Sequence, residues 1–286
     1  MSATVNPVWR WRSEVWRPSL LPRLMGILNV TPDSFSDGGC FDNVPAAVSQ
    51  GLQLAADGAD LLDIGGESTR PGAEAVTADN ELKRVIPVIE QLAAQIRIPI
   101  SIDTMKGQVA REALAAGASI VNDVSAGTFD PELLDVCADT DCGVILMHMQ
   151  GTPRTMQTAP HYQDVVAEVT DYLVARLNVC EQRGVARERV AFDPGIGFGK
   201  NAEHNVSLLT HIAELRAAGR PVLIGHSRKR YLYKLLGRET DERLAGTIGV
   251  SISLAMQGAD LLRVHDVRAV RDALRTWQAT RPCPQT

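Results

Sequence analysis

The chain has 286 residues, a formal net charge of −5 at pH 7, and 45% hydrophobic and 22% charged residues. That length and composition are typical of a globular protein with one large domain or two ordinary ones, and the acidic balance argues against a nucleic-acid partner. The five cysteines lack a Cys-x-x-Cys spacing, which favours free thiols in a reducing compartment over a disulfide framework. The sequence contains neither a secretory signal nor a confident membrane span, so we expect a cytoplasmic protein with no membrane partner.

Short apolar runs that predict buried strands alternate with segments of helical period. The predicted strands are residues 24–29, 61–65, 100–103, 120–123, 144–148, 190–193, 222–225 and 261–264. The predicted helices are about 45–57, 79–96, 106–116, 131–138, 163–183, 202–218, 241–257 and 267–279. Alternation of this kind requires parallel strands joined by crossover helices. Eight such units in about 250 residues predict the α/β class and a single-domain (β/α)₈ TIM barrel; a doubly wound open sheet is the alternative.

The expected barrel domain spans residues 21–280, between an N-terminal extension at 1–20 and a C-terminal tail at 281–286. The extension contains Trp9, Trp11 and Trp16. Tryptophans bury large apolar areas. We expect them to cover one end of the barrel core.

Polar residues stand at the carboxyl ends of most predicted strands. They are Asn29, Asp63, Asp103, Asn122, Asp193, the Ser227-Arg228-Lys229 group, Arg263 and His265. In a parallel barrel all these ends surround one mouth. Burying so many charges costs several kcal/mol for each unpaired ion, so the sequence predicts a ligand site there.

The strand-end residues divide into two chemical groups. Asp103, Asn122 and Asp193 suit a neutral heterocycle that presents N–H edges, because a carboxylate accepts two parallel N–H bonds. Arg70, Arg263 and His265 offer donors and positive charge, which suits phosphate. Asn29 offers an oxygen to Mg²⁺, an ion that keeps most of its waters and also takes phosphate oxygens.

Two features of the sequence resemble a phosphate-binding loop and a catalytic or metal-binding histidine, but we interpret both as structural. Residues 193–200, Asp-Pro-Gly-Ile-Gly-Phe-Gly-Lys, contain glycines and a lysine, but not at the spacing of a phosphate-binding P-loop or of a dinucleotide fingerprint. His148 stands between two methionines at a strand end, where we expect a packed, hydrogen-bonded residue.

Eight motifs make the sequence similar to the dihydropteroate synthase family, from about residue 24 to residue 274. They are GILNVTPDSFSDGG (26–39), DIGGESTRPG (63–72), SIDT (101–104), VNDV (121–124), MHMQGTP (147–153), DPGIGFGK (193–200), GHSRK (225–229) and RVHDV (263–267). The resemblance implies a (β/α)₈ barrel that condenses a dihydropterin carrying a hydroxymethyl diphosphate with 4-aminobenzoate, giving 7,8-dihydropteroate and pyrophosphate. It also implies a homodimer and small-molecule substrates.

The resemblance further implies a role for each matching residue. The pterin ligands would be Asp103, Asn122, Met147, Asp193, Gly197 and Lys229. The diphosphate ligands would be Asn29, Thr69, Arg70, Arg263 and His265, with Mg²⁺ on Asn29. The 4-aminobenzoate ligands would be Phe35, Pro71, Phe198, Ser227 and Lys229. Arg70, Lys229, Arg263 and His265 would be catalytic. We expect an Arg263→Ala change to weaken pyrophosphate binding and to spare simple pterins.

Two alternatives share the same barrel. A methyltetrahydrofolate-binding methyltransferase domain needs the pterin acceptors but no diphosphate ligands, so Arg70, Arg263 and His265 favour the synthase. A pterin-binding paralogue without activity would have lost loop or strand-end residues, and this sequence retains them. Its departures from the family pattern are small, chiefly His226, Arg230, Tyr231 and Asn201.

Overall fold

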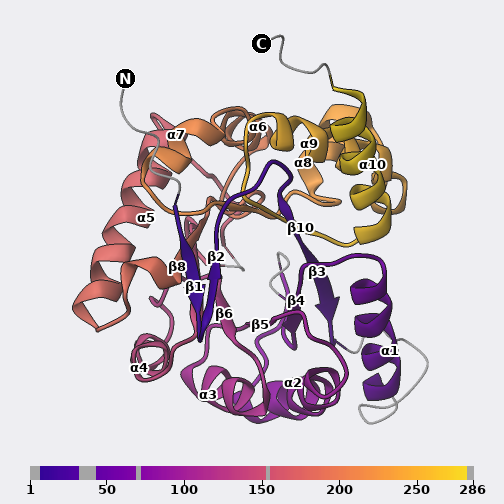
Figure 1. The fold of residues 1–286 in the computed structure, drawn as a ribbon. Helices are drawn as coiled ribbons and strands as arrows, with labels where there is room; N and C mark the ends of the chain where they lie inside the picture. Colours follow the sequence, from indigo (N-terminus) through magenta and orange to yellow (C-terminus); the bar gives the residue numbers. More distant parts are fainter. Residues whose placement is uncertain (1–6, 32–42, 69–71, 153–154, 282–286) are drawn as a thin grey trace.

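The computed structural model describes residues 7–31, 43–68, 72–152 and 155–281. Within these residues, eight parallel strands form one sheet in the order β8-β7-β6-β5-β4-β3-β10-β9. A single bridge between Phe192 and Val222 joins the two edge strands and closes the sheet into a barrel. The helices form a ring outside the strands (Figure 1). The predicted (β/α)₈ barrel is confirmed.

The barrel strands lie close to their predicted positions. They are β3 (Arg23–Asn29), β4 (Leu61–Gly65), β5 (Ile100–Asp103), β6 (Ile120–Asp123), β7 (Gly143–Met147), β8 (Val190–Asp193), β9 (Leu223–Ile224) and β10 (Leu261–Val264). The helices are α1 (Asn43–Ala56), α2 (Ala78–Ala93), α3 (Gly107–Ala116), α4 (Glu132–Asp139), α5 (Val165–Gln182), α6 (Ala202–Thr210), α7 (Ile212–Ala217), α8 (Arg230–Leu236), α9 (Leu244–Met256) and α10 (Val267–Thr280).

Two helix predictions are wrong in detail. The single helix expected over 202–218 is divided at His211, whose φ of −123° and ψ of 43° are not helical. The helix expected over 241–257 begins at Leu244, and the short helix α8 before it was not predicted. An apolar run alone does not locate such breaks, because they depend on local backbone and side-chain contacts.

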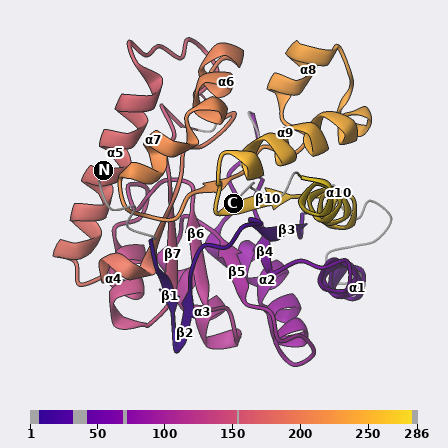
Figure 2. The same cartoon turned by 45° about the horizontal axis from the view of Figure 1, so that its top comes forward.

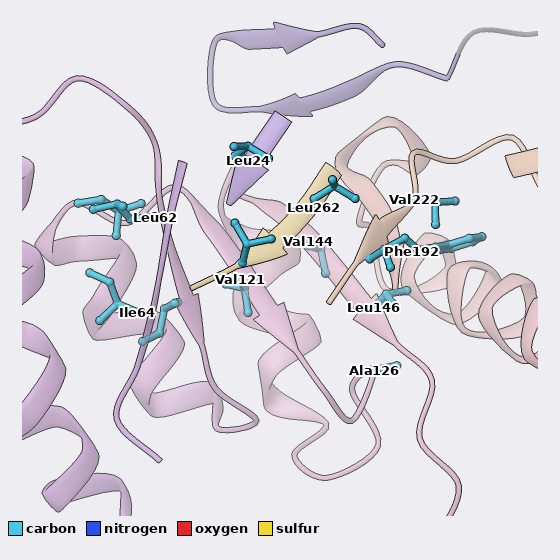
Figure 3. Packing of buried hydrophobic residues seen from close by; sticks show 14 of the residues in the cluster. Leu24, Leu62, Ile64, Val121, Ala126, Val144, Leu146, Phe192, Val222 and Leu262 are labelled. Carbon is cyan, nitrogen blue, oxygen red and sulfur yellow. The ribbon is translucent and has the colours of Figure 1, made fainter. Parts of the chain in front are cut away.

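Alternate strand residues separate the inside of the barrel from the outside. Leu62 and Ile64 of β4 pack outward against the helices, in a layer that Figure 3 draws in part. Leu61 packs inward, in a separate cluster with the interior residues of other strands. Asp63 follows Leu61 by two positions and is fully buried, so it lies one layer further along the interior.

A short N-terminal hairpin covers the amino ends of the barrel strands. Its strands β1 (Trp9–Trp11) and β2 (Glu14–Trp16) are antiparallel, and Figures 1 and 2 show the hairpin lying across the strands. Trp9, Trp11 and Trp16 are buried against the first interior residues of the barrel. The indole of Trp9 donates a hydrogen bond of 2.9 Å to the Arg189 carbonyl. The prediction that the tryptophans cover one end of the core is confirmed, and the other end is left for the site.

No helix in the described part of the chain combines the length and the apolar character needed to cross a membrane. The domain boundaries at residues 20 and 280 stay predictions.

Candidate functional site

A cavity opens at the carboxyl ends of the barrel strands. Its lining residues are Asp103, Asn122, Val124, Met147, Asp193, Ile196, Phe198, Gly225, Lys229 and Arg263. Seven of these were predicted as site residues from sequence, and they come from strands or loops far apart in the chain. A wider depression between α5 and the α6–α7 segment contains none of the predicted residues. The candidate site is therefore the cavity at the barrel mouth.

Arg263 lies at the centre of a buried polar network. Its Nε donates to Asp63 Oδ2 at 2.6 Å, and its Nη2 donates to Asp103 Oδ2 at 2.8 Å. Asn122 Nδ2 donates to the same Asp63 oxygen at 3.0 Å. Because the Asn122 amide nitrogen faces Asp63, its carbonyl oxygen remains as an acceptor for a ligand. The sequence placed Asp63 at the mouth but did not assign it to the site; counting two residues on from inward-facing Leu61 would have done so.

The network holds two carboxylates and one guanidinium. Burial raises the pKa of Asp103 to about 7, an effect that Arg263 opposes and Asp63 reinforces. One cation does not neutralise two buried carboxylates, so the direction of this shift agrees with the geometry. Asp63 Oδ1 has no hydrogen-bond partner in the described part of the chain. The network therefore contains unused acceptor capacity for N–H groups.

Asp193 faces the cavity from the end of β8. Its Oδ1 accepts the Gly195 amide N–H at 2.7 Å, which fixes the carboxylate orientation. Burial raises the pKa of Asp193, and the Gly195 hydrogen bond and the charge of Lys229 oppose that rise. The carboxylate retains its second oxygen as an acceptor for a ligand N–H.

His265 and Ser227 form a pair beside Arg263. The Ser227 hydroxyl lies 3.1 Å from His265 Nδ1 and accepts the His265 amide N–H at 3.3 Å. Burial and the charge of Arg263 lower the pKa of His265 to about 3. This lowered pKa disfavours a charged imidazole in the free protein and argues against the expectation that His265 supplies positive charge; its assignment as a diphosphate ligand stays a prediction. The imidazole offers an N–H donor, and Ser227 holds the ring.

Phe198 and Lys229 form another part of the cavity wall. The Lys229 ammonium lies 4.2 Å from the centre of the Phe198 ring, within the range of a cation–π contact. Gly197 packs behind the Lys229 stem, where an ideal Cβ would lie 3.2 Å from Lys229 Cδ. These three residues place an aromatic face and a cation next to each other.

The glycines of residues 193–200 have a structural purpose. Gly195 and Gly199 have φ values of +69° and +61°. An ideal Cβ on Gly195 would lie 1.9 Å from the His148 carbonyl oxygen, and one on Gly199 would lie 2.5 Å from that of Gln150. The loop thus contacts the loop after β7 backbone to backbone, which excludes side chains at these positions. This agrees with the sequence argument against a phosphate loop.

His148 and His226, singled out in the sequence, are buried in packed environments. The His148 ring lies edge-on to Tyr172 at 4.9 Å, as expected for a packed strand-end residue. His226 Nε2 lies 2.8 Å from Ser251 Oγ on α9, so it joins the end of β9 to that helix. Arg230 is exposed at the start of α8.

Asn29 lies at the mouth, next to the acidic network. In the sheet register Asn29 pairs with Gly65, and Gly65 pairs with Asp103. Four other predicted site residues, Phe35, Thr69, Arg70 and Pro71, lie outside the described residues. Their assignments stay predictions.

Comparison with known proteins agrees with this geometry. Residues 25–265 match the family model described as pterin binding enzyme. The dihydropteroate synthase of Escherichia coli strain K12 is 48% identical over 259 residues, which cover 91% of this chain and 92% of that protein.

Two structures of the Xanthomonas albilineans dihydropteroate synthase are similar along nearly the whole chain. The structure with 4-aminobenzoic acid has a TM-score of 0.90 and 52% identity, covering 98% of this chain and 100% of the other. The structure with 7,8-dihydropteroate has a TM-score of 0.86 and 50% identity, covering 97% and 100%. With the polar ring at the barrel mouth, these likenesses show that the chain belongs to the dihydropteroate synthase family of pterin-binding enzymes.

Proposed function

We propose that the cavity at the barrel mouth is the active site in which this synthase condenses 6-hydroxymethyl-7,8-dihydropterin diphosphate with 4-aminobenzoate. The observation that carries the proposal is the convergence of Asp103, Asn122, Asp193, Lys229 and Arg263 on one cavity. Acceptors and cations there match the N–H edge of a pterin and the charge of a diphosphate.

The pterin ring would lie against the acceptor side of the cavity. Asn122 has a free carbonyl because its amide nitrogen faces Asp63, and Asp193 retains one carboxylate oxygen. Asp103 adds a second carboxylate, and Met147 supplies an apolar surface for the ring. Gly197 would act by allowing Lys229 to pack closely.

The diphosphate would lie beside Arg263 and His265. Arg263 uses two of its N–H donors on Asp63 and Asp103, and an arginine has five. His265 adds the N–H of a neutral imidazole. Asn29, Thr69 and Arg70 complete the proposed set, the last two from the connection between β4 and α2.

The 4-aminobenzoate would lie between the pterin and the Phe198–Lys229 wall. A lysine ammonium over an aromatic ring leaves positive charge near the benzoate carboxylate. Phe35 and Pro71 are proposed for the same pocket. Ser227, also assigned there from sequence, is held against His265, so its support of that ring is the role the geometry favours.

The reaction forms a bond from the amine nitrogen to the pterin methylene carbon and breaks the bond from that carbon to the diphosphate oxygen. Arg70, Arg263 and His265 would stabilise the charge that grows on the leaving group. Asp103 and Asp193 would stabilise positive charge on the pterin, with Lys229 between the two substrates. The arylamine is neutral at pH 7 and loses its proton to water after the bond forms, so the step needs no strong general base.

We propose Mg²⁺ as the cofactor, held by Asn29. The described residues contain no group of three His, Cys, Asp or Glu side chains placed to bind a metal. Mg²⁺ commonly takes one or two protein oxygens together with waters and phosphate oxygens, so a single amide oxygen beside the diphosphate fits this ion. When bound, the ion neutralises charge on the diphosphate.

We also propose a cytoplasmic homodimer. The described cysteines Cys137, Cys142 and Cys180 are free and buried, which suits a reducing compartment. Large apolar side chains are exposed on α8 and α9, including Leu235 at 58% and Met256 at 68%. An exposed apolar surface of this kind supports the proposal of a contact between copies. Analytical ultracentrifugation of a Leu235→Glu, Met256→Glu double variant tests it: a monomer is expected, and an unchanged mass contradicts this interface.

The activity is tested by pyrophosphate release with the diphosphate substrate, with and without 4-aminobenzoate. Sustained release and formation of dihydropteroate are expected when both substrates and Mg²⁺ are present. Absence of both products in a folded preparation contradicts the proposal.

The pterin assignment is tested by calorimetric titration of a pterin into an Asp193→Asn variant. An asparagine whose oxygen keeps the bond to the Gly195 amide turns its NH2 group toward the pterin, where an acceptor is needed. A charge-assisted bond is worth roughly 1.5–3 kcal/mol, so we expect affinity to fall by about one to two orders of magnitude. Asp123→Asn is the matched control, because that buried strand-end carboxylate bonds to Ser125 and Gly127 instead. Wild-type affinity in Asp193→Asn contradicts the assignment.

A further inference from the structure

Lys200 is a buried lysine for which the mechanism above has no use. Only 2% of its surface is exposed, and its pKa is lowered to about 7 by burial, with Asp193 opposing that shift. A buried ammonium without partners is costly. The groups around Lys200 must therefore compensate its buried charge.

The Lys200 ammonium has an acceptor for each of its three donors. Its Nζ lies 2.9 Å from the Phe198 carbonyl oxygen, 3.3 Å from that of His148 and 2.9 Å from His148 Nδ1. The third contact requires a neutral imidazole with its lone pair on Nδ1, and burial followed by the charge of Lys200 lowers the pKa of His148 to about 3. The geometry thus fits a protonated lysine and a neutral histidine.

These three bonds join two loops of the cavity. Phe198 lies in the loop after β8, and His148 lies directly after β7. The His148 amide also donates to the Asp193 carbonyl at 3.0 Å, next to the proposed pterin carboxylate. Lys200 thus joins the backbone of Phe198, which precedes Gly199, to His148 at the end of β7.

We propose that Lys200 is a positioning residue of the synthase, which holds Phe198 at the angle where its ring faces Lys229 and so shapes the 4-aminobenzoate site. The inference rests on the proposed function in one respect, the assignment of Phe198 and Lys229 to that substrate. Lys200 itself is buried behind the wall and does not line the cavity. Its effect is transmitted through the Phe198 backbone.

The test compares KM for each substrate, kcat and thermal midpoint in a Lys200→Met variant. Methionine keeps most of the side-chain volume and removes all three donors. We expect KM for 4-aminobenzoate to rise on the order of tenfold, because a displacement of about 1 Å at a site can cost up to 10²-fold. KM for the diphosphate substrate is expected to change much less.

Arg220→Met is the matched control. Arg220 is also a buried cation, 4% exposed, that donates to backbone carbonyls, here those of Val190 and Val8 at the opposite end of the barrel. The Arg220→Met variant should have a lower thermal midpoint, with unchanged KM for 4-aminobenzoate and for the diphosphate substrate. A Lys200→Met variant that behaves in the same way as this control overturns the positioning role.

Two further variants separate the possible failures. Phe198→Ala tests the substrate assignment itself: an unchanged KM for 4-aminobenzoate removes the proposed site and the inference with it. If KM for 4-aminobenzoate rises in Phe198→Ala but equals the wild-type value in Lys200→Met, only the positioning role of Lys200 is refuted. Lys200→Gln retains two N–H donors, so it should recover part of the lost affinity, and it is the test variant if Lys200→Met does not fold. A KM for 4-aminobenzoate in Lys200→Gln equal to wild type contradicts the proposal in that case.

Discussion

Replacing Arg263 by methionine should destabilise the protein strongly. The guanidinium is bonded to Asp63 and Asp103, whose side chains are 0% and 12% exposed. Removing one partner from a buried ion pair typically costs about 3–5 kcal/mol, because a charge remains without compensation. We expect the low end of this range at pH 7, since Asp103 has a pKa of about 7 and can take up a proton.

Urea unfolding followed by circular dichroism measures this loss. With a slope of about 3 kcal/mol/M for a chain of this size, the midpoint should fall by about 1 M or more. Arg187→Met is the control, because its two bonds to Glu181 are made at the surface, where the arginine side chain is 50% exposed. Exposed pairs of this kind contribute about 0.2–1 kcal/mol.

A second substitution identifies the cause of the loss. In the Arg263→Met, Asp103→Asn double variant one buried charge is removed, so stability should recover by about 1–3 kcal/mol relative to the single variant. The loss should also shrink toward pH 5, where Asp103 is protonated. A midpoint change no larger than that of the Arg187 control would refute the view that Arg263 compensates these carboxylates.

The same contacts change the expectation for ligand binding. The sequence predicted that loss of Arg263 spares simple pterins. Because Arg263 donates to Asp103 at 2.8 Å, its removal alters the proposed pterin carboxylate as well. We now expect pterin and pyrophosphate binding both to weaken, which calorimetric titration of each ligand measures.

Three other predictions address the fold and its pH dependence. Gly195→Ala should unfold at a clearly lower urea concentration than wild type, because its Cβ would lie 1.9 Å from the His148 carbonyl oxygen. Gly219→Ala is the control: its φ is +78° and nothing lies within 4 Å, so the free energy of unfolding should fall by only about 1–2 kcal/mol. Equal losses of stability in the two variants would contradict the close approach at Gly195. Trp9→Ala should cost about 3–5 kcal/mol in the same assay, and a change below about 1 kcal/mol would show that the hairpin does not support the barrel. The folded pKa of Asp103 is raised from 3.8 to about 7, so between these pH values the folded protein binds a proton that the unfolded chain does not. The stabilisation of the folded state by this proton is fully present below pH 4 and is lost as pH rises through 7. The urea midpoint of wild type relative to Asp103→Asn should therefore fall from pH 4 to pH 7, and a constant difference would contradict the shift.

The sequence by itself determined the barrel and the members of its mouth. Strand positions followed from apolar runs of four to six residues bounded by glycines and polar residues. Parallel strands place all their carboxyl ends together, so Asp103, Asn122 and Arg263 were expected to meet without knowledge of any contact. Asp63 was placed at the mouth for the same reason, as a polar residue at a predicted strand end, whereas the inward orientation of Leu61 that explains its burial came from the structure.

Only the tertiary structure decided how these groups pair and which of them are charged. The contacts of Arg263 with Asp63 and Asp103 span 200 and 160 positions in the chain, and local sequence does not encode such distances. The lowered pKa of His265 depends on burial and on the neighbouring Arg263. The hairpin that covers the barrel and the bonds of Lys200 likewise arise from packing between distant segments. Residue types and their spacing specify where polar groups emerge, whereas their partners and protonation depend on the solvent that the complete fold excludes.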